Sequence, residues 1–180
     1  MEKLVTITYL EMTARAGLRR ARDPEAPFIV TRAEVPSPEL NRFFYKAVGA
    51  QWRWYERLTW DDAQWLQYLD RPEVQTWVGY FRGTPAGYFE LERNETSVQI
   101  AYFGLLLRFI GKGLGGALLT KAIECAWEMG ANRVWVHTCD LDHPQALANY
   151  LARGMKLYRT EKKIENVPNV AGDVVMSNAI

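Results

Sequence analysis

The chain has 180 residues, of which 48% are hydrophobic and 24% are charged. This length and composition predict one domain with a sizeable buried core. Lysine and arginine together number 22 against 21 acidic residues, and the formal net charge of +1 argues against nucleic acid or another polyanion as a partner.

The N-terminal sequence predicts a cytoplasmic protein. Residues 1–17 lack the basic start, the apolar stretch and the small-residue cleavage site of a signal peptide. No apolar run is long enough to span a bilayer, so we expect no membrane partner. The two cysteines, Cys125 and Cys139, form no paired motif, and we expect reduced thiols rather than a disulfide.

The first part of the chain predicts two strands followed by two helices. Residues 3–12 and 28–35 are rich in β-branched and apolar residues, and a basic loop that ends in prolines separates them. Ser37 caps a helix that begins at Pro38, and Thr59 opens a second helix with acidic residues in its first turn.

The rest of the chain alternates β-rich runs with amphipathic ones. We expect strands over 74–81, 86–92, 96–107, 132–138, 155–164 and 173–176, and helices over 114–130 and 144–153. The first two of these strands form a hairpin through the turn at 82–85. This order predicts the α/β (α+β) class, with a mixed, mostly antiparallel central sheet and helices on both of its faces.

A glycine-rich turn separates the strand over 96–107 from the helix that follows it. Four glycines, Gly111, Gly113, Gly115 and Gly116, surround Lys112, whereas an ordinary strand-to-helix connection needs one or two. Glycines allow close approach of a ligand to the backbone, and a helix N-terminus offers unpaired N–H groups and a positive dipole end. The pattern therefore predicts a site for a phosphate or pyrophosphate.

Two known nucleotide-binding motifs can be compared with this turn. A Walker A loop needs G-x-x-x-x-G-K-[ST], which the sequence does not contain. The dinucleotide fingerprint G-x-G-x-x-G is met by Gly111, Gly113 and Gly116, and Asp140 follows the next strand. Only one strand–helix–strand crossover is visible, however, where a doubly wound domain needs several. A dinucleotide-binding protein therefore stays open as the third hypothesis.

The segment from Gln99 to Met155 resembles the GCN5-related N-acetyltransferase (GNAT) superfamily, especially bacterial members of unassigned substrate. The family's [Q/R]-x-x-G-x-[G/A] motif falls on "IGKGLG" at 110–115. Gly113 and Gly115 match this motif, while Ile110 stands where the family has Gln or Arg. That difference removes a side chain but leaves the backbone groups in place.

A second motif lies downstream at the expected separation. The family pattern N-P-x-A-x-x-x-Y-x-x-x-G-F is similar to "HPQALANYLARGM" at 143–155. The matching residues are Pro144, Ala146, Tyr150 and Gly154. His143 replaces the asparagine and Met155 replaces the phenylalanine.

The resemblance implies acetyl-CoA as the cofactor and CoA as the product. It implies a bulged central strand, splayed from its neighbour, whose backbone pairs with the pantetheine, and a turn whose backbone binds the pyrophosphate. The residues that it assigns to cofactor binding are Phe103, Gly104, Leu105, Leu106, Leu107, Ile110, Gly111, Lys112, Gly113, Leu114, Gly115, Gly116, His143, Ala146 and Tyr150.

The resemblance also implies catalytic roles. Tyr150 occupies the position of the tyrosine that protonates the departing CoA sulfur; a core aromatic is its structural alternative. Gln99 stands where some members have a glutamate base, and an amide is no useful base near neutral pH. A water chain or an acid on the neighbouring strand must then serve. Glu90 and Glu92 share one face of that strand, and Glu90 is the first candidate.

The segment "HTCDLDH" at 137–143 gathers metal-binding residue types. These are His137, Cys139, Asp140, Asp142 and His143. They lack a standard metal-ligand spacing, and most metal sites draw ligands from more than one element. We therefore predict no metal site here and expect a loop beside the acetyl-binding cleft, with contact to substrate left open.

These patterns together predict one N-acetyltransferase domain over residues 1–180. The acceptor-side half is about 1–95 and the acetyl-CoA-binding half 96–165. The expected reaction is direct attack of a primary amine, on a small molecule or a peptide, in a ternary complex. The region with Arg53, Trp54, Tyr55 and Arg57 covers the acceptor site by analogy. The second hypothesis is a non-catalytic or weakly catalytic acyl-CoA-binding sensor or regulatory module. A monomer and a homodimer both fit.

Overall fold

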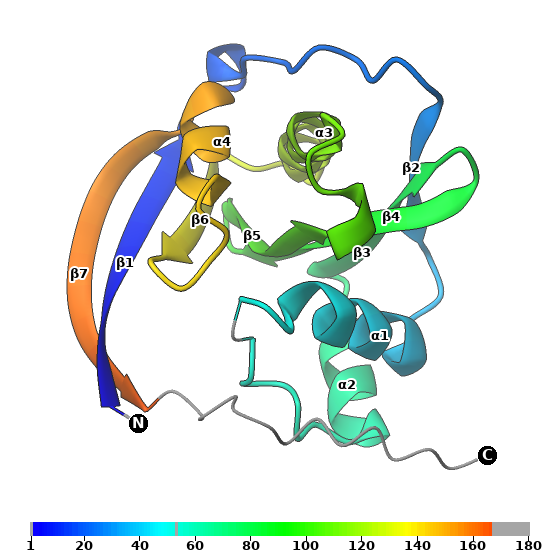
Figure 1. The fold of residues 1–180 in the computed structure, drawn as a ribbon, viewed down its shortest axis with the longest axis vertical. Helices are drawn as coiled ribbons and strands as arrows, with labels where there is room; N and C mark the ends of the chain where they lie inside the picture. The colour runs from blue at the N-terminus through cyan, green and yellow to red at the C-terminus, as the bar shows by residue number, and fades with distance from the viewer. Residues whose placement is uncertain (1, 53, 167–180) are drawn as a thin grey trace.

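The computed structural model describes residues 2–52 and 54–166, which form one seven-stranded sheet with helices on both faces (Figure 1). The strands are β1 Glu2–Met12, β2 Phe28–Ala33, β3 Val74–Phe81, β4 Thr84–Asn94, β5 Ser97–Leu105, β6 Arg133–Cys139 and β7 Lys156–Asn166. The helices are α1 Pro38–Gly49, α2 Asp62–Leu69, α3 Leu114–Glu128 and α4 Ala146–Ala152, with short 3-10 turns at Arg15–Gly17 and Leu107–Phe109.

The sheet has the strand order β2-β3-β4-β5-β6-β1-β7. All neighbouring pairs are antiparallel except β5 and β6, which are parallel because α3 connects them. This confirms the predicted mixed, mostly antiparallel sheet. Within the described ranges, no helix has the length and apolar character needed to cross a membrane.

Most predicted boundaries agree with the structure to within about two residues, and the start of α2 shows why one differs. Asp61, not Thr59, is the N-cap: its side chain accepts a hydrogen bond from the Gln64 N–H at 2.8 Å, and the Gln64 side chain accepts from the Asp61 N–H at 3.0 Å. This reciprocal capping box satisfies two N–H groups at once, so the helix begins after Asp61. The strand predicted over 173–176 lies outside the described residues, as does Arg53.

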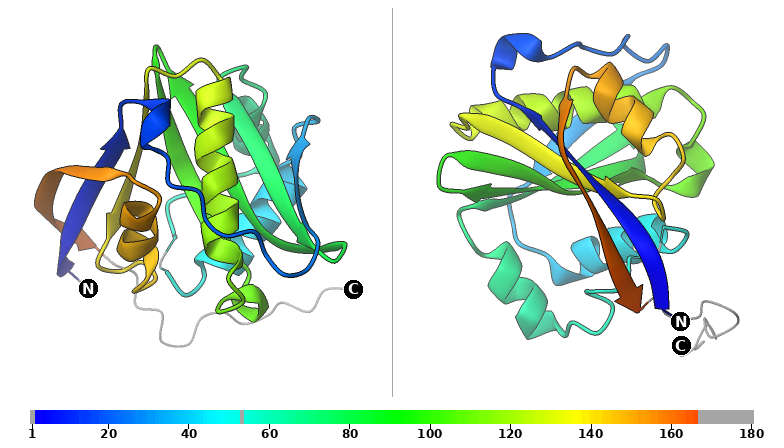
Figure 2. Two further views of the ribbon diagram at one scale, coloured as in Figure 1. Left: turned by 90° about the horizontal axis from the view of Figure 1, so that it is seen from above. Right: turned by 90° about the vertical axis from the view of Figure 1, so that its left-hand side faces the viewer.

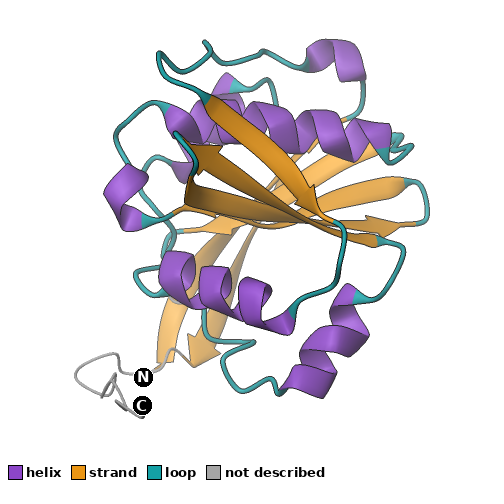
Figure 3. Cartoon of the chain, turned by 90° about the vertical axis from the view of Figure 1, so that its right-hand side faces the viewer, coloured by secondary structure: helices purple, strands orange, loops and turns teal. Residues whose placement is uncertain are grey.

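The helices form two layers (Figures 2 and 3). Helix α3 crosses one face of the sheet with α4 beside it, and α1 and α2 lie against the other face. The apolar side of α3 is fully buried against β4, β5 and β6, including Leu118, Leu119, Ala122 and Ile123. Burial of a leucine or isoleucine side chain contributes about 1.5–3 kcal/mol, which fixes α3 and thereby the turn at its N-terminus.

The central strand β5 is both bulged and splayed, as the resemblance implied. Leu91 of β4 pairs with Ile100, whereas Glu90 pairs with Tyr102, so Ala101 is an extra residue on β5. Its pairing with β6 covers only Ser97–Gln99. Beyond Gln99 the two parallel strands separate, and backbone groups on that edge of β5 face a gap instead of a neighbouring strand.

Candidate active site

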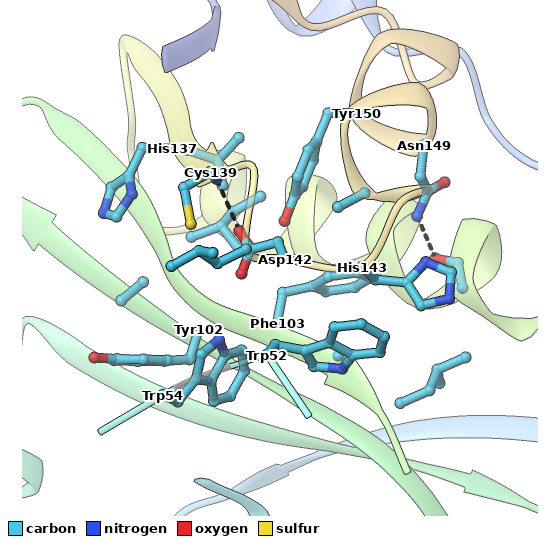
Figure 4. A pocket seen from close by; sticks show the side chains of 18 of the residues that line it. Trp52, Trp54, Tyr102, Phe103, His137, Cys139, Asp142, His143, Asn149 and Tyr150 are labelled. Atoms are coloured by element: carbon cyan, nitrogen blue, oxygen red, sulfur yellow. Dashed lines mark hydrogen bonds between the residues drawn. The ribbon is translucent and has the colours of Figure 1, made fainter. Parts of the chain in front are cut away.

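A cavity of about 910 Å³ occupies the gap between β5 and β6 (Figure 4). Its walls come from β5, β6, the glycine turn, α4 and the loop between α1 and α2. The wall has two parts, a turn side and a loop side. The turn side comprises Gly111, Gly115, Gly116, Asn149 and Tyr150. The loop side, on the face of the sheet that α1 and α2 cover, comprises Tyr45, Trp54, Tyr55, Glu56 and Tyr102, together with Glu165 of β7.

The glycine turn presents backbone rather than side chains. Gly111 and Gly113 have φ angles of 80° and 75°, in the left-handed region that only glycine adopts at low cost. Gly113 is also the N-cap of α3, so the N–H groups of the first turn of α3 have no partner within the helix. A Cβ built at either glycine meets no atom within 4 Å, which leaves open space at this helix N-terminus.

Most of the residues assigned to cofactor binding by sequence do line the cavity. They are Phe103, Gly104, Leu105, Ile110, Gly111, Gly115, Gly116, His143, Ala146 and Tyr150. Five do not: Leu106, Leu107, Lys112, Gly113 and Leu114. Leu106 packs beside the Phe44 cluster on the far face of the sheet, and the side chain of Leu114 is fully buried in the core, so neither side chain is available to a ligand.

Tyr150 projects from α4 into the cavity with its hydroxyl foremost (Figure 4). Its ring packs 6.2 Å from that of Phe103, and only 6% of the residue is exposed. The hydroxyl has no hydrogen-bond partner among the described residues. Burial, and secondarily the charge of Asp142, raise the pKa of Tyr150 well above its usual value, so the phenol keeps its proton at any physiological pH.

Of the polar residues around α4, His143 was predicted from the sequence and Asn149 was missed. Asn149 donates from Nδ2 to the Gly115 carbonyl at 3.3 Å and so ties α4 to the glycine turn. His143 Nδ1 accepts from the Gln145 N–H at 3.0 Å, and its ring stands edge-on to Trp52 at 4.8 Å. In the neutral imidazole the proton is then on Nε2, as a donor. The signal available in the sequence was that Asn149 directly precedes Tyr150 within the second motif.

The 137–143 segment is organised by hydrogen bonds. Asp142 Oδ2 accepts from Thr138 Oγ1 at 2.7 Å and from the Cys139 N–H at 3.0 Å. Over the described residues, no three His, Cys, Asp or Glu side chains are placed to hold a metal ion. Cys139 lines the cavity as a free thiol, and burial, then the charge of Asp142, raises its pKa to about 11. His137 lines the cavity too, whereas Asp140 does not and instead accepts from the Thr6 N–H.

The candidate bases fall in different places. Gln99 lines the cavity, and its cross-strand neighbour Glu92 lines it as well. Glu90 does share a face of β4 with Glu92, but it is fully buried and does not line the cavity. Its Oε2 lies 2.8 Å from Arg57 Nη1, and its Oε1 accepts from Asn41 Nδ2 at 2.8 Å. Glu90 is therefore the partner of a buried cation, because α1 and the following loop cover it.

Arg57 links the loop to the sheet. Its guanidinium lies 4.0 Å from the ring centroid of Tyr68 and 4.4 Å from that of Tyr102, with Trp60 and Trp65 close by. A charge enclosed in this way is stable only with a close counter-ion and favourable contacts with aromatic faces. The Arg57–Glu90 pair thus anchors the loop against β4.

The loop side of the cavity carries two carboxylates at its surface. The Tyr55 hydroxyl donates to Glu165 Oε2 at 3.0 Å, and the Tyr102 hydroxyl donates to Glu56 Oε2 at 3.4 Å. Burial, followed by the bond to Glu165, raises the pKa of Tyr55 to about 12, so Tyr55 remains a donor. Glu165 gave no signal in the sequence, since it is more than a hundred residues from the loop that it meets.

Residues 38–155, well over half of the chain, match the family described as the acetyltransferase (GNAT) family. Solved structures show the same fold. A GCN5-related N-acetyltransferase from Kribbella flavida is 17% identical with a TM-score of 0.63, and the match covers 88% of this chain and 57% of that one. A GCN5-related N-acetyltransferase from Sphaerobacter thermophilus is 18% identical with a TM-score of 0.61, covering 89% and 52%.

A third structure is an aminoglycoside acetyltransferase from an uncultured soil metagenomic sample, solved with trehalose. It is 18% identical with a TM-score of 0.56, and the match covers 70% of this chain and 86% of that one. Identities this low establish the shared fold only. No curated protein sequence matches the chain significantly. The chain also spans little more than half the length of the Kribbella and Sphaerobacter structures.

Proposed function

The chain belongs to the acetyltransferase (GNAT) family, and from this premise we propose that it transfers the acetyl group of acetyl-CoA to a primary amine by direct attack in a ternary complex. The observation that carries the proposal is the gap beyond Gln99. An open strand edge there shares one cavity with the glycine turn and the hydroxyl of Tyr150.

The described residues fit acetyl-CoA. The open space at Gly111 and Gly113 and the free N–H groups at the start of α3 suit a pyrophosphate, because a helix N-terminus favours anions. Lys112 adds a positive charge in the same turn. The unpaired edge of β5 over 101–105 suits an extended amide-containing chain, which can pair with it as a further strand would. Bound there, acetyl-CoA supplies the acetyl group as a thioester.

The chain's own residues then divide the chemistry among them. A backbone N–H of β5 near Phe103 or Gly104 stabilises the negative charge that develops on the carbonyl oxygen. Tyr150 holds its proton until the thioester C–S bond breaks and then gives it to the sulfur. The attacking nitrogen loses its proton through water along the wall of Gln99 and Glu92. Because burial keeps the Cys139 thiol protonated at neutral pH, this thiol does not compete with the amine as a nucleophile.

Thermal unfolding with acetyl-CoA, CoA, NAD and ATP in parallel tests the cofactor. A ligand present at a hundred times its dissociation constant stabilises the protein by about 2.7 kcal/mol. Stabilisation by acetyl-CoA and CoA alone is the expected result, and stabilisation by NAD alone would favour the dinucleotide hypothesis.

Release of CoA that depends on an added amine tests the transfer itself. Turnover no higher than that of a Tyr150→Phe control across a broad amine panel, with acetyl-CoA still bound, would favour the sensor or regulatory module. That alternative rests on Gln99 and Ile110, two of the positions where the chain differs from its family's patterns.

A further inference from the structure

Resting on the proposed function, we propose that the amine substrate carries a second positive charge, which Glu56 and Glu165 bind on the loop side of the cavity. The substrate class is therefore a diamine or polyamine rather than a monoamine or an amino acid. The reacting nitrogen lies near Tyr150 and the distal ammonium lies between the two carboxylates.

The two carboxylates meet around one hydroxyl group. Tyr55 donates directly to Glu165 of β7, and Glu56, the next residue in the loop, is close enough that its charge also acts on the Tyr55 phenol. Glu56 is held by the Tyr102 hydroxyl from β5. Three separate elements therefore bring these acids to the same part of the cavity wall, and both side chains line it.

The other charges of the wall are already compensated. Glu92 is paired with Arg71 at 2.6 Å, and Arg57, the one permanent cation among the described lining residues, is paired with buried Glu90. Asp142 accepts two hydrogen bonds from its own loop.

Glu56 and Glu165 lack such strong partners. Glu56 forms no ion pair with any described residue, and the nearest cation to Glu165 is Lys163, 3.8 Å away and 65% exposed. Among the residues that the structure describes, the loop side of the cavity therefore has an excess of negative charge, which attracts a cation and repels a carboxylate.

Aromatic rings line the same cavity as Tyr150 and the two acids. Tyr45, Trp54 and Tyr102 pack against one another with centroid separations of 4.9–5.6 Å, and all three line the cavity. Their faces suit an alkyl chain or ring and add attraction for an ammonium group. Independently of the acids, Tyr150 marks this space as a ligand site, because its phenol is 6% exposed, faces the cavity and has no partner among the described residues.

The reaction balances with the distal charge as a spectator. The neutral proximal nitrogen forms the new C–N bond, the C–S bond breaks, the nitrogen loses one proton to water, and the sulfur gains one from Tyr150. Tyr150 then regains a proton from water, so no net proton is gained or lost. The distal ammonium neither gains nor loses a bond and serves only to position the substrate.

A matched set of amines tests the proposal. Cadaverine, pentylamine and aminocaproate present an ammonium, a methyl and a carboxylate group at similar distances from the reacting amine, and putrescine and spermidine vary the reach. Calorimetric affinity in the presence of CoA and kcat/KM for CoA release are both measured. We expect the best of cadaverine, putrescine and spermidine to exceed pentylamine about tenfold in affinity and about tenfold in kcat/KM. A factor of this size corresponds to one hydrogen bond to a charged group.

Charge-removing variants identify the residues. Glu56→Gln and Glu165→Gln keep an acceptor for Tyr102 and Tyr55 but remove the charge, and together they are expected to abolish the diamine preference. Glu25→Gln, on an exposed loop outside the cavity, makes the same change in net charge as either single substitution and is expected to leave the preference intact.

Equal affinity for the diamines and pentylamine, preference for aminocaproate, or an unchanged preference in the double variant would overturn the proposal. These outcomes are distinct from failure of the proposed function. A protein that acetyl-CoA stabilises but that shows no diamine preference refutes only the substrate class. A protein that acetyl-CoA does not stabilise refutes the proposed function, and the calorimetric comparison of the amines still decides the charge preference.

Discussion

The turn side and the loop side of the cavity are built in opposite ways. The turn side uses mainly the backbone groups of the contiguous glycine turn at 111–116, together with two adjacent residues of α4. The loop side uses side chains from α1, the following loop, β5 and β7, which are far apart in the sequence. A site made of backbone groups needs few particular side chains, whereas a site made of side chains changes with each substitution.

This difference explains how Ile110 can replace the family's Gln or Arg without removing the turn. The positive φ of Gly111 and Gly113 and the free N–H groups of α3 remain. On the loop side a substitution removes the binding group itself, so the identity of Glu56 or Glu165 decides which ligands the wall attracts. Four substitutions test this difference between the turn side and the loop side.

The largest effect is expected at Tyr150, where the two sides meet. Tyr150→Phe removes only the hydroxyl, and loss of a general acid lowers kcat by about 10²–10⁴-fold. Steady-state CoA release measures the loss, and an unchanged thermal shift with acetyl-CoA is the control for binding. Retention of wild-type kcat would mean that the proton comes from elsewhere. Because the pKa of Tyr150 is raised, no alkaline loss of the proton donor is expected near neutral pH in the wild type.

Arg57→Met is expected to destabilise the loop side strongly. It leaves Glu90 buried without its counter-ion, and breaking such a pair costs about 3–5 kcal/mol. Urea unfolding measures the change. The double variant Arg57→Met/Glu90→Gln removes both charges and keeps an acceptor for Asn41, so it should regain at least half of the loss. No recovery in the double variant would show that the aromatic contacts of Arg57, not the ion pair, carry the stability.

Gly113→Glu is expected to abolish the turn side's affinity for acetyl-CoA. The carboxylate would stand in the open space at the N-terminus of α3, where it opposes a pyrophosphate. The thermal stabilisation of about 2.7 kcal/mol at a hundredfold excess of ligand should disappear. Gly113→Ala is the control: both variants pay about 1–2 kcal/mol for a positive φ, but the alanine variant should still respond to the ligand. Equal thermal stabilisation of the two variants by acetyl-CoA would show that the pyrophosphate does not bind at this turn.

Tyr55→Phe is expected to have the smallest effect on stability, and that effect should disappear at high pH. The folded pKa of Tyr55, about 12, exceeds the ordinary value of 10.0, so its contribution to stability is complete below pH 10 and is lost as the pH rises toward 12. Solvent at the cavity mouth limits the difference to about 1 kcal/mol or less. Stability curves of the two proteins between pH 9 and 12 measure it. Parallel curves would show that Tyr55 titrates normally.

Local patterns predicted the elements of this fold well because they depend on near neighbours in the chain. Ser37 and Pro38 start α1 as expected, since capping and the fixed φ of proline act within one turn. The second helix shows the limit of that reasoning. Two possible capping residues, Thr59 and Asp61, precede it, and only the reciprocal bonds between Asp61 and Gln64 decide which of them is the cap.

The sequence by itself determined the order of strands and helices, the family resemblance and the glycine turn, because periodicity, capping and backbone conformation are properties of short segments. It also placed Glu90 and Glu92 on one face of their strand. Only the tertiary structure decided that α1 and its loop bury Glu90 with Arg57, while Glu92 reaches the cavity. It likewise brought Glu165 to Tyr55. Alternation along a strand sets the face of a side chain, but the elements that pack on that face decide whether it becomes a counter-ion or a ligand-binding group.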